Sequence, residues 1–127
     1  MSQPEMEIRR DGTKCWCLNG KYHREDGPAV EYPDGEKRWY LHGKFHREDG
    51  PAIEYPSGEK WWFLNGKRHR EDGPAIEYPD GQKCWFLNSE EVSWEQVFRQ
   101  AKTPEIELRI LAAALTNAWL DGWRFVC

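Results

Sequence analysis

The sequence predicts an α+β protein, an antiparallel β-meander of 23-residue hairpin repeats in an elongated single sheet, capped by two C-terminal helices. The segment His-Arg-Glu-Asp-Gly-Pro-Ala occurs at residues 23–29, 46–52 and 69–75, and the units align without gaps. Each unit holds two turn motifs that bound strand-like runs. After residue 88 the repeat ends and apolar residues follow a helical spacing. We therefore expect a β-repeat sheet over residues 1–90 and a helical cap over 91–127.

Other positions follow the same 23-residue period. The aligned columns are Tyr32, Tyr55 and Tyr78; Gly12, Gly35, Gly58 and Gly81; and Trp16, Trp39, Trp62 and Trp85. Because the glycine and tryptophan columns begin before the first complete unit, a fragment of a repeat precedes it.

The turn residues divide each unit into a hairpin. In the central unit, Pro56 and Gly58 are typical of one turn, and Asn65-Gly66 favours a type I′ turn. The first strand is expected over about 52–55 and the second over about 60–64. Neighbouring strands lie about 4.8 Å apart, so equivalent residues of adjacent repeats should lie about 9 to 10 Å apart.

Side chains alternate across a strand, so the columns can be assigned to two faces. The invariant Trp column and a Leu column (Leu18, Leu41, Leu64 and Leu87) are expected to form the core. The other face varies: its columns are Cys15, Arg38, Trp61 and Cys84, and Cys17, Tyr40, Phe63 and Phe86. Variation between repeats could provide specificity, and Trp, Tyr and Arg are common interface anchors. We predict that Arg38, Tyr40, Trp61, Phe63 and Phe86 bind a partner.

The C-terminal region has helix signals. Ser93 and Gln96 match a capping box, and Thr103-Pro104 places an N-cap before a proline at the first helical position. Two helices are expected, over about 94–101 and 104–120. They either cap the last hairpin, as terminal units of repeat arrays do, or dock a partner or a second copy.

The His-Arg-Glu-Asp segments invite three interpretations. A metal or catalytic cluster is disfavoured because rows about 10 Å apart cannot converge on one ion. A structural turn fits better, with Asp bonded to nearby backbone and Arg paired with a carboxylate of the next repeat. The remaining alternative is an anion-binding ladder made of His23, Arg24, His46, Arg47, His69 and Arg70. We expect no metal, no cofactor and, because no nucleophile elbow occurs, no enzymatic activity.

Composition restricts the partners. The formal net charge is −4, with 18 basic and 22 acidic residues interleaved along the chain, so nucleic acid is not expected. The sequence has no apolar leader and no apolar run of 18 residues, so we expect no membrane association and a cytoplasmic location. The four cysteines lack paired C-x-x-C spacing and are expected to be reduced.

The unit Gly-Pro-Ala-Ile-Glu-Tyr-Pro-Asp-Gly followed by Trp-Phe-Leu-Asn-Gly resembles the variant MORN repeat over residues 11–88. The resemblance implies hairpins lined up in an elongated sheet that acts as a scaffold or interaction surface, without catalytic residues. The chain departs from that pattern at its Trp column and at the inserted His-Arg-Glu-Asp segment. Repeats with this signature resemble proteins of bacteria, phages and large viruses, a context in which the chain would act in the host cytoplasm.

The function expected from these observations is a protein-binding module, in the viral context a small inhibitor of a host defence protein. Two alternatives remain open at the level of sequence. One is a small-ligand or nucleotide sponge, in which His-Arg pairs grip phosphates and rings stack on bases. The other is a structural protein whose apolar face self-associates, for instance as a homodimer.

Overall fold

The computed structural model describes the backbone of residues 3–121 and the side chains of residues 3–115. The strands are β1 (Glu5–Ile8), β2 (Lys14–Leu18), β3 (Lys21–Tyr22), β4 (Val30–Glu31), β5 (Lys37–Arg38), β6 (Tyr40–Leu41), β7 (Lys44–Phe45), β8 (Ile53–Glu54), β9 (Lys60–Trp61), β10 (Phe63–Leu64), β11 (Lys67–Arg68), β12 (Ile76–Glu77), β13 (Lys83–Cys84), β14 (Phe86–Leu87) and β15 (Glu90–Glu91). The helices are α1 (Trp94–Arg99) and α2 (Pro104–Asp121).

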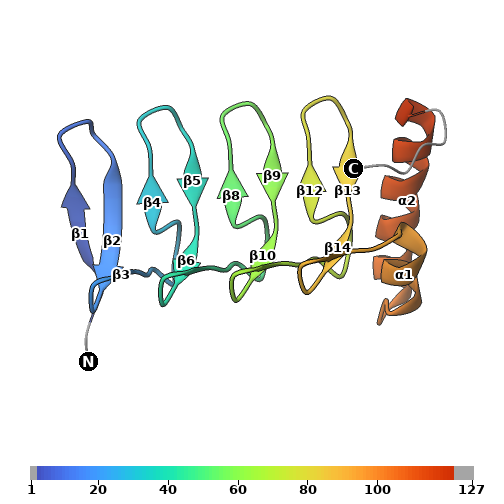
Figure 1. Ribbon diagram of the computed structural model, residues 1–127, viewed down its shortest axis with the longest axis horizontal. Coiled ribbons are helices and arrows are strands. Elements are labelled where there is room, and N and C mark those ends of the chain that lie inside the picture. Colours follow the sequence, from blue (N-terminus) through green and yellow to red (C-terminus); the bar gives the residue numbers. More distant parts are fainter. Residues whose placement is uncertain (1–2, 122–127) are drawn as a thin grey trace.

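A nine-stranded antiparallel sheet runs the length of the molecule in the order β1-β2-β4-β5-β8-β9-β12-β13, with β3 paired to β2. Its hairpins stand side by side in chain order, and both helices lie at one end (Figure 1). The predicted α+β class, the meander and the helical cap are therefore confirmed.

Each repeat contains a second hairpin that the sequence did not predict. The run expected over 60–64 is divided at Trp62 into β9, in the large sheet, and β10, which pairs with β11. Trp62 N–H still donates to Ala75 O of the large sheet, whereas Trp62 O accepts a bond from His69 N. The chain therefore leaves the large sheet at this residue. The hairpins β6–β7 and β14–β15 repeat the arrangement.

The second hairpins are joined to one another by two backbone hydrogen bonds at each junction, one of which runs from the arginine of the repeated segment, as from Arg24 N to Tyr40 O. Gly43 N donates to Tyr22 O over 2.9 Å, and Gly66 N donates to Phe45 O over 2.8 Å. The residue before each of these glycines has positive φ, as the type I′ turn requires: 52° at His42 and 51° at Asn65. These bonds align the turns in a second row beside the large sheet.

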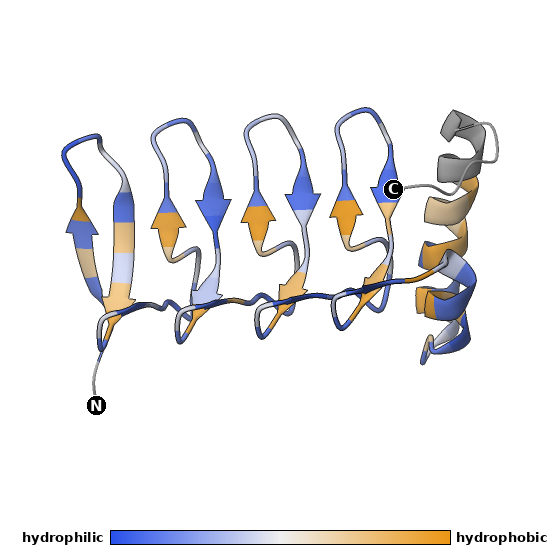
Figure 2. Ribbon diagram, viewed as in Figure 1, coloured by the Kyte–Doolittle hydropathy of each residue, from blue (hydrophilic) through white to orange (hydrophobic). Residues whose placement is uncertain are grey.

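The interior is built from small and β-branched residues of the first hairpins. Ala29, Ala52 and Ala75 are fully buried, and Val30, Ile53 and Ile76 are at most 5% exposed. Figure 2 shows the apolar strands β4, β8 and β12 recurring in successive hairpins. The expectation that the Trp column forms the core is correct for Trp85, whereas the other three tryptophans are half-buried.

The two helices cover the last repeat. The predicted capping box is present at the start of α1, where Ser93 and Gln96 exchange hydrogen bonds, and Thr103 Oγ1 accepts a bond from Ile106 N at the start of α2. Val97 of α1 and Ile110 of α2 pack with Trp85 in one buried cluster. This arrangement supports the capping interpretation of the helices.

Two further observations concern the cysteines and the helices. Cys15 and Cys17 are free thiols, and burial raises the pKa of Cys15. Cys84 is disulfide-bonded, so the expectation of reduced cysteines is wrong for this residue. Within the described residues, neither helix has the length and apolar content needed to cross a bilayer.

Candidate binding surfaces

An uninterrupted row of aromatic rings crosses the second hairpins. Ring centroids are 5.1 Å apart for Tyr22 and Tyr40, 4.4 Å for Tyr40 and Phe45, and 5.0 Å for Phe45 and Phe63. These four residues, named here the aromatic row, are all half-buried. The spacings are those of favourable ring pairs, so each ring holds its neighbours in place.

Two side chains of the neighbouring column border the row, and each is held by an acidic residue two positions earlier. Arg38 Nε donates to Glu36 Oε2 over 2.6 Å, and Trp61 Nε1 donates to Glu59 Oε2 over 2.6 Å. The Trp61 ring lies nearly parallel to Phe63, with an interplanar angle of 8° and a centroid distance of 6.3 Å. Equivalent positions therefore carry a guanidinium in one repeat and an indole in the next. In both repeats a glutamate two residues earlier holds the side chain.

Arginines close both ends of the row. Arg9 lies 5.9 Å from the Tyr22 ring centroid and donates to its hydroxyl over 2.6 Å. At the other end, Arg68 lies opposite Phe63 in the pairing of β10 with β11, and its guanidinium lies 4.3 Å from the centre of the Phe86 ring, which is outside the row. Burial raises the pKa of Tyr40, so its hydroxyl stays protonated and remains a hydrogen-bond donor.

The structure brings together four of the five residues predicted to bind a partner. Arg38, Tyr40, Trp61 and Phe63 are half-buried and lie in or beside the aromatic row. Phe86 is only 6% exposed and packs with Ile76 and Cys84. Its ring therefore contributes to the interior of the last repeat and adds no accessible surface.

Sequence reasoning missed Tyr22 and Phe45, which supply half of the row. Both follow the turn glycine and a lysine, and they align with Arg68 and Glu91 in other repeats. The register of β6 and β7 sets Phe45 opposite Tyr40. Reading the segment after Asn/His-Gly as a returning strand would have found this column.

The three histidines of the repeated segment connect successive units. Nδ1 of His23 accepts a hydrogen bond from His42 N over 2.9 Å, and His46 and His69 accept equivalent bonds from Asn65 N and Asn88 N. A backbone N–H can only donate, so the accepting Nδ1 is unprotonated and the ring proton lies on Nε2. In the third unit, Nε2 lies 3.1 Å from Glu71 Oε2.

The three arginines of the segment make the same four contacts in every repeat. Arg47 Nε donates to Asp49, its Nη1 donates to Pro51 O and to Glu54 Oε2, and its guanidinium lies 3.9 Å from the centre of the Trp39 ring. Gly50 leaves room for this arrangement, because a Cβ there would lie 2.9 Å from Arg47 Cζ. Arg24 and Arg70 repeat the pattern on Trp16 and Trp62.

These contacts favour the structural interpretation of the segment over an anion-binding ladder. Each arginine is bound by two carboxylates and stacked on an indole, and each histidine uses Nδ1 to hold the next turn. The carboxylate of Glu31, Glu54 or Glu77 pairs with Arg as expected. Asp26, Asp49 and Asp72 bond to Arg Nε rather than to backbone. Within the described residues, no three His, Cys, Asp or Glu side chains are arranged to hold a metal ion.

Comparisons of the chain with protein-family models, with curated proteins and with solved structures found no match. The geometry of the two faces is therefore the basis for a functional proposal.

Proposed function

We propose that this chain is a non-enzymatic, MORN-like repeat module that binds a protein through the aromatic row together with Arg38 and Trp61. The observation that carries the proposal is the row itself, four half-buried rings in mutual contact across three repeat units. Such rings offer a large apolar contact area, and Tyr, Trp and Arg dominate the binding energy of many interfaces.

The surface is already organised before a partner arrives. Each ring of the row is held by its neighbours, while the side chains of Arg38 and Trp61 are fixed by Glu36 and Glu59. Immobilising a flexible side chain at an interface costs about 0.5 to 1.5 kcal/mol, and this cost is reduced where the side chain is already held.

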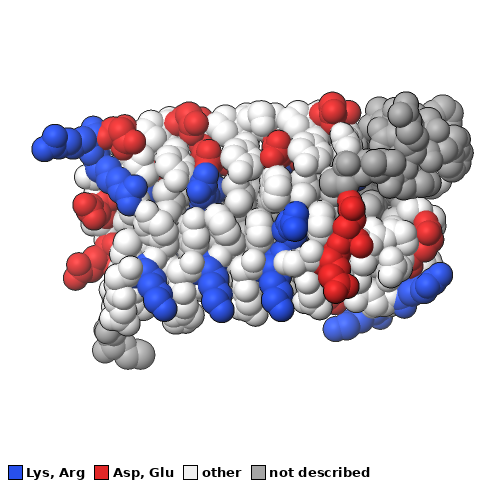
Figure 3. Space-filling model, in the orientation of Figure 1, with Lys and Arg blue, Asp and Glu red and all other residues white. Residues whose placement is uncertain are grey.

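The shape of the region fits a protein better than a small molecule. Three grooves of about 620 to 720 Å³ are lined by other residues, and none of these grooves includes a ring of the row. Beside the row, Lys21, Lys44 and Lys67 recur at the 23-residue period, and Glu90 takes the equivalent position in the last hairpin. Figure 3 shows basic side chains at regular intervals and acidic ones near the helices. A partner would therefore meet an apolar strip bordered by charge of changing sign.

The repeats suggest substitutions that keep the scaffold intact. Trp61→Arg with Phe63→Tyr converts two positions of one unit into the residues found 23 positions earlier, Arg38 and Tyr40. Affinity capture from host-cell lysate with mass spectrometry should recover a partner with the unaltered chain and lose it with this double variant. Leu108→Ala is the matched control, because Leu108 is 67% exposed on α2. If the correctly folded double variant recovers the same partner in equal amount, the assignment of the surface is wrong.

The biological setting belongs to the same proposal. A cytoplasmic inhibitor of a host defence protein, encoded by a phage or another virus, needs a compact binding surface and no catalytic group. The captured protein would decide this point: a housekeeping protein as the specific partner would exclude the inhibitor role and leave the binding role intact.

Self-association is a second candidate, favoured by the exposed strand β1. The described residues pair β1 with β2 alone, and Met6 and Ile8 are 49% and 59% exposed. An unpaired edge with apolar side chains is a template for another strand. Light scattering at two concentrations tests this candidate, and a mass that stays monomeric at both would exclude it.

A further inference from the structure

Two open grooves lie between adjacent repeats, lined by the tryptophan and leucine columns. Groove 1 has a volume of about 650 Å³ and is lined by Trp39 and Leu41, between residues 24–28 and 46–49. Groove 2 has a volume of about 620 Å³ and is lined by the equivalent Trp62 and Leu64, with Ile106 and Arg109 of α2 also at its wall. The indole and leucine side chains form an apolar patch in each groove, and most of the other lining side chains are charged.

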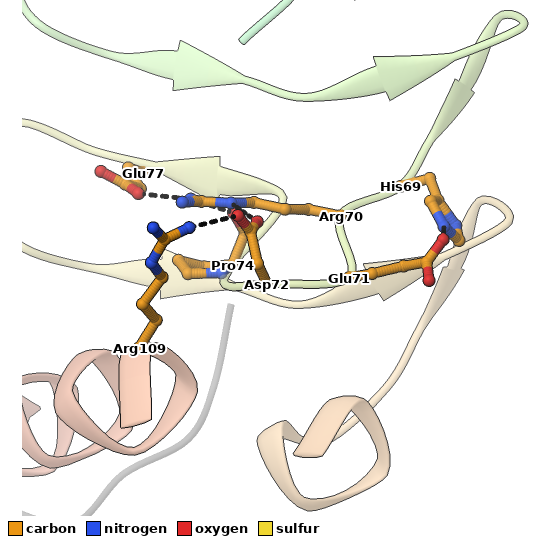
Figure 4. Close-up of polar contacts among 7 residues, drawn as sticks. All are labelled: His69, Arg70, Glu71, Asp72, Pro74, Glu77 and Arg109. Carbon is orange, nitrogen blue, oxygen red and sulfur yellow. Dashed lines mark hydrogen bonds and ion pairs between the residues drawn. The ribbon is translucent and has the colours of Figure 1, made fainter. Parts of the chain in front are cut away.

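The equivalent site in the following repeat, called here the third position, is filled by side chains of the two helices. There Trp85 and Leu87 pack with Val97 of α1 and Ile110 of α2. Beside this apolar contact, Arg109 Nη1 lies 3.4 Å from Asp72 Oδ2. Figure 4 shows Arg109 reaching from α2 to Asp72, which also binds Arg70. The occupant of the third position is thus a helix that presents an apolar residue next to a basic one.

The equivalent acidic residues of the three units differ in exposure, and those nearest α2 are the least exposed. The Asp72 side chain is 36% exposed, compared with 86% for both Asp26 and Asp49. Glu71 is 45% exposed, compared with 83% for Glu25 and Glu48. Glu25, Asp26, Glu48 and Asp49 therefore keep their carboxylates in solvent, whereas Glu71 and Asp72, which also line groove 2, are partly covered and Asp72 has a basic partner in α2.

The charged side chains at the rims of the open grooves determine whether a ligand should be a cation or an anion. Each Arg of the segment is shared by two carboxylates, and the histidine beside it is held with Nδ1 unprotonated. The exposed Glu25 and Glu48 add further negative charge. The rims of the grooves are therefore net acidic and attract cations, opposite to the anion-binding ladder expected from the His-Arg pairs.

We propose that grooves 1 and 2 dock a cationic amphipathic helix of a partner protein, in the manner in which α2 occupies the third position. An apolar side chain of the partner would lie against Trp39 and Leu41, and a neighbouring Arg or Lys would bind Asp26 or Asp49. This surface is separate from the aromatic row, so the proposal does not depend on the function proposed above.

The probe for this site is a peptide derived from α2. It spans residues 104–115, keeps Ile106, Arg109 and Ile110, and carries Glu105→Lys and Glu107→Lys so that it is cationic. A second peptide keeps both glutamates and carries Arg109→Glu. Fluorescence polarisation with the full chain should detect saturable binding of the cationic peptide and at least tenfold weaker binding of the anionic one.

Two variants of the chain locate the site. Glu25→Lys with Glu48→Lys reverses charge at side chains that are 83% exposed, so the fold should persist, and the affinity for the cationic peptide should fall at least tenfold. Glu90→Lys with Glu91→Lys changes the net charge equally at β15, where other repeats carry basic residues in β11, and should leave the affinity within twofold.

Three results of the peptide experiments would overturn the proposal. They are no saturable binding of the cationic peptide, equal binding of both peptides, and equal loss of affinity in the two lysine variants. A concentration-dependent dimer abolished by Glu25→Lys with Glu48→Lys would identify a second copy of the chain as the occupant and reject a separate partner. Full retention of peptide binding by Trp61→Arg with Phe63→Tyr is expected if the two surfaces are distinct.

Discussion

The two faces of the repeat array differ in how strictly the sequence is repeated. On one face, Arg24, Arg47 and Arg70 make the same contacts to tryptophan, aspartate, proline carbonyl and glutamate in three successive units. On the other, equivalent positions hold Arg38 and Trp61, or Tyr40 and Phe63, on similar supports. In this molecule an invariant column carries scaffold contacts, while a varied column is free to acquire specificity. The repeated His-Arg-Glu-Asp segment is the most conspicuous motif, but the varied columns indicate better where a partner binds.

The most severe test removes one invariant arginine. Arg47→Ala deletes two ion pairs, one bond to a carbonyl and the stacking on Trp39, and leaves Glu54 without its cation. We expect the free energy of unfolding to fall by about 3 kcal/mol, since a partly buried ion pair, a charged hydrogen bond and the stacking on Trp39 are lost together. Urea denaturation followed by circular dichroism measures it. Lys44→Ala, at an exposed site, is the control, and a loss as small as the control would contradict the scaffold role.

A smaller loss is expected at the glycine beside that arginine. Gly50→Ala places a Cβ 2.9 Å from Arg47 Cζ, and such overpacking costs about 1 to 2 kcal/mol. In the Arg47→Ala background the obstruction is gone, so the added cost should drop below about 0.5 kcal/mol. A double-mutant cycle by urea denaturation gives both values. Strict additivity would show that Gly50 is required for another reason.

The histidine contact should be weaker again. His46→Phe removes the acceptor for Asn65 N–H, which should lower the free energy of unfolding by about 1 kcal/mol. His46→Asn can present its side-chain oxygen near the position of Nδ1 and should recover part of the loss. Thermal unfolding of both variants gives the comparison. Equal destabilisation by Phe and Asn would argue against the hydrogen bond as the cause.

The varied face should tolerate change with the smallest effect on stability. Trp61→Arg with Phe63→Tyr reproduces a column that already exists one repeat earlier, so the free energy of unfolding should change by less than about 1 kcal/mol. Urea denaturation measures the change. If the free energy of unfolding falls by more than it does in Gly50→Ala, the varied face does not tolerate change better than the invariant face.

Local signals predicted much of the fold. The 23-residue period placed the first hairpins, and Ser93 with Gln96 and Thr103 with Pro104 placed the helix starts. These features depend on residues close in sequence, which is why the sequence alone predicts them. The column of Arg38 and Trp61 and the column of Tyr40 and Phe63 were likewise found by alternation along a strand.

The features that were missed depend on contacts made across a turn or between neighbouring hairpins. The alternating pattern continues through Trp62, so nothing local marks the division between β9 and β10, which is set by a bond from His69 N. The Arg-Trp stacking joins residues eight positions apart across a turn, such as Trp39 and Arg47. Phe86 looked accessible because its column is, and the Arg68 side chain that covers it comes from the neighbouring hairpin.

The join between units has a consequence for how such an array could evolve. His46 holds the turn that begins at Asn65, and Gly66 donates to Phe45, so each unit offers the next one the same acceptors and donors that it received. Duplication or loss of one 23-residue block leaves every junction matched and the helices still seated on the final tryptophan. The number of inter-repeat grooves would then change by one with each event. A change in the number of repeats therefore changes the number of grooves without altering the contacts that join the units.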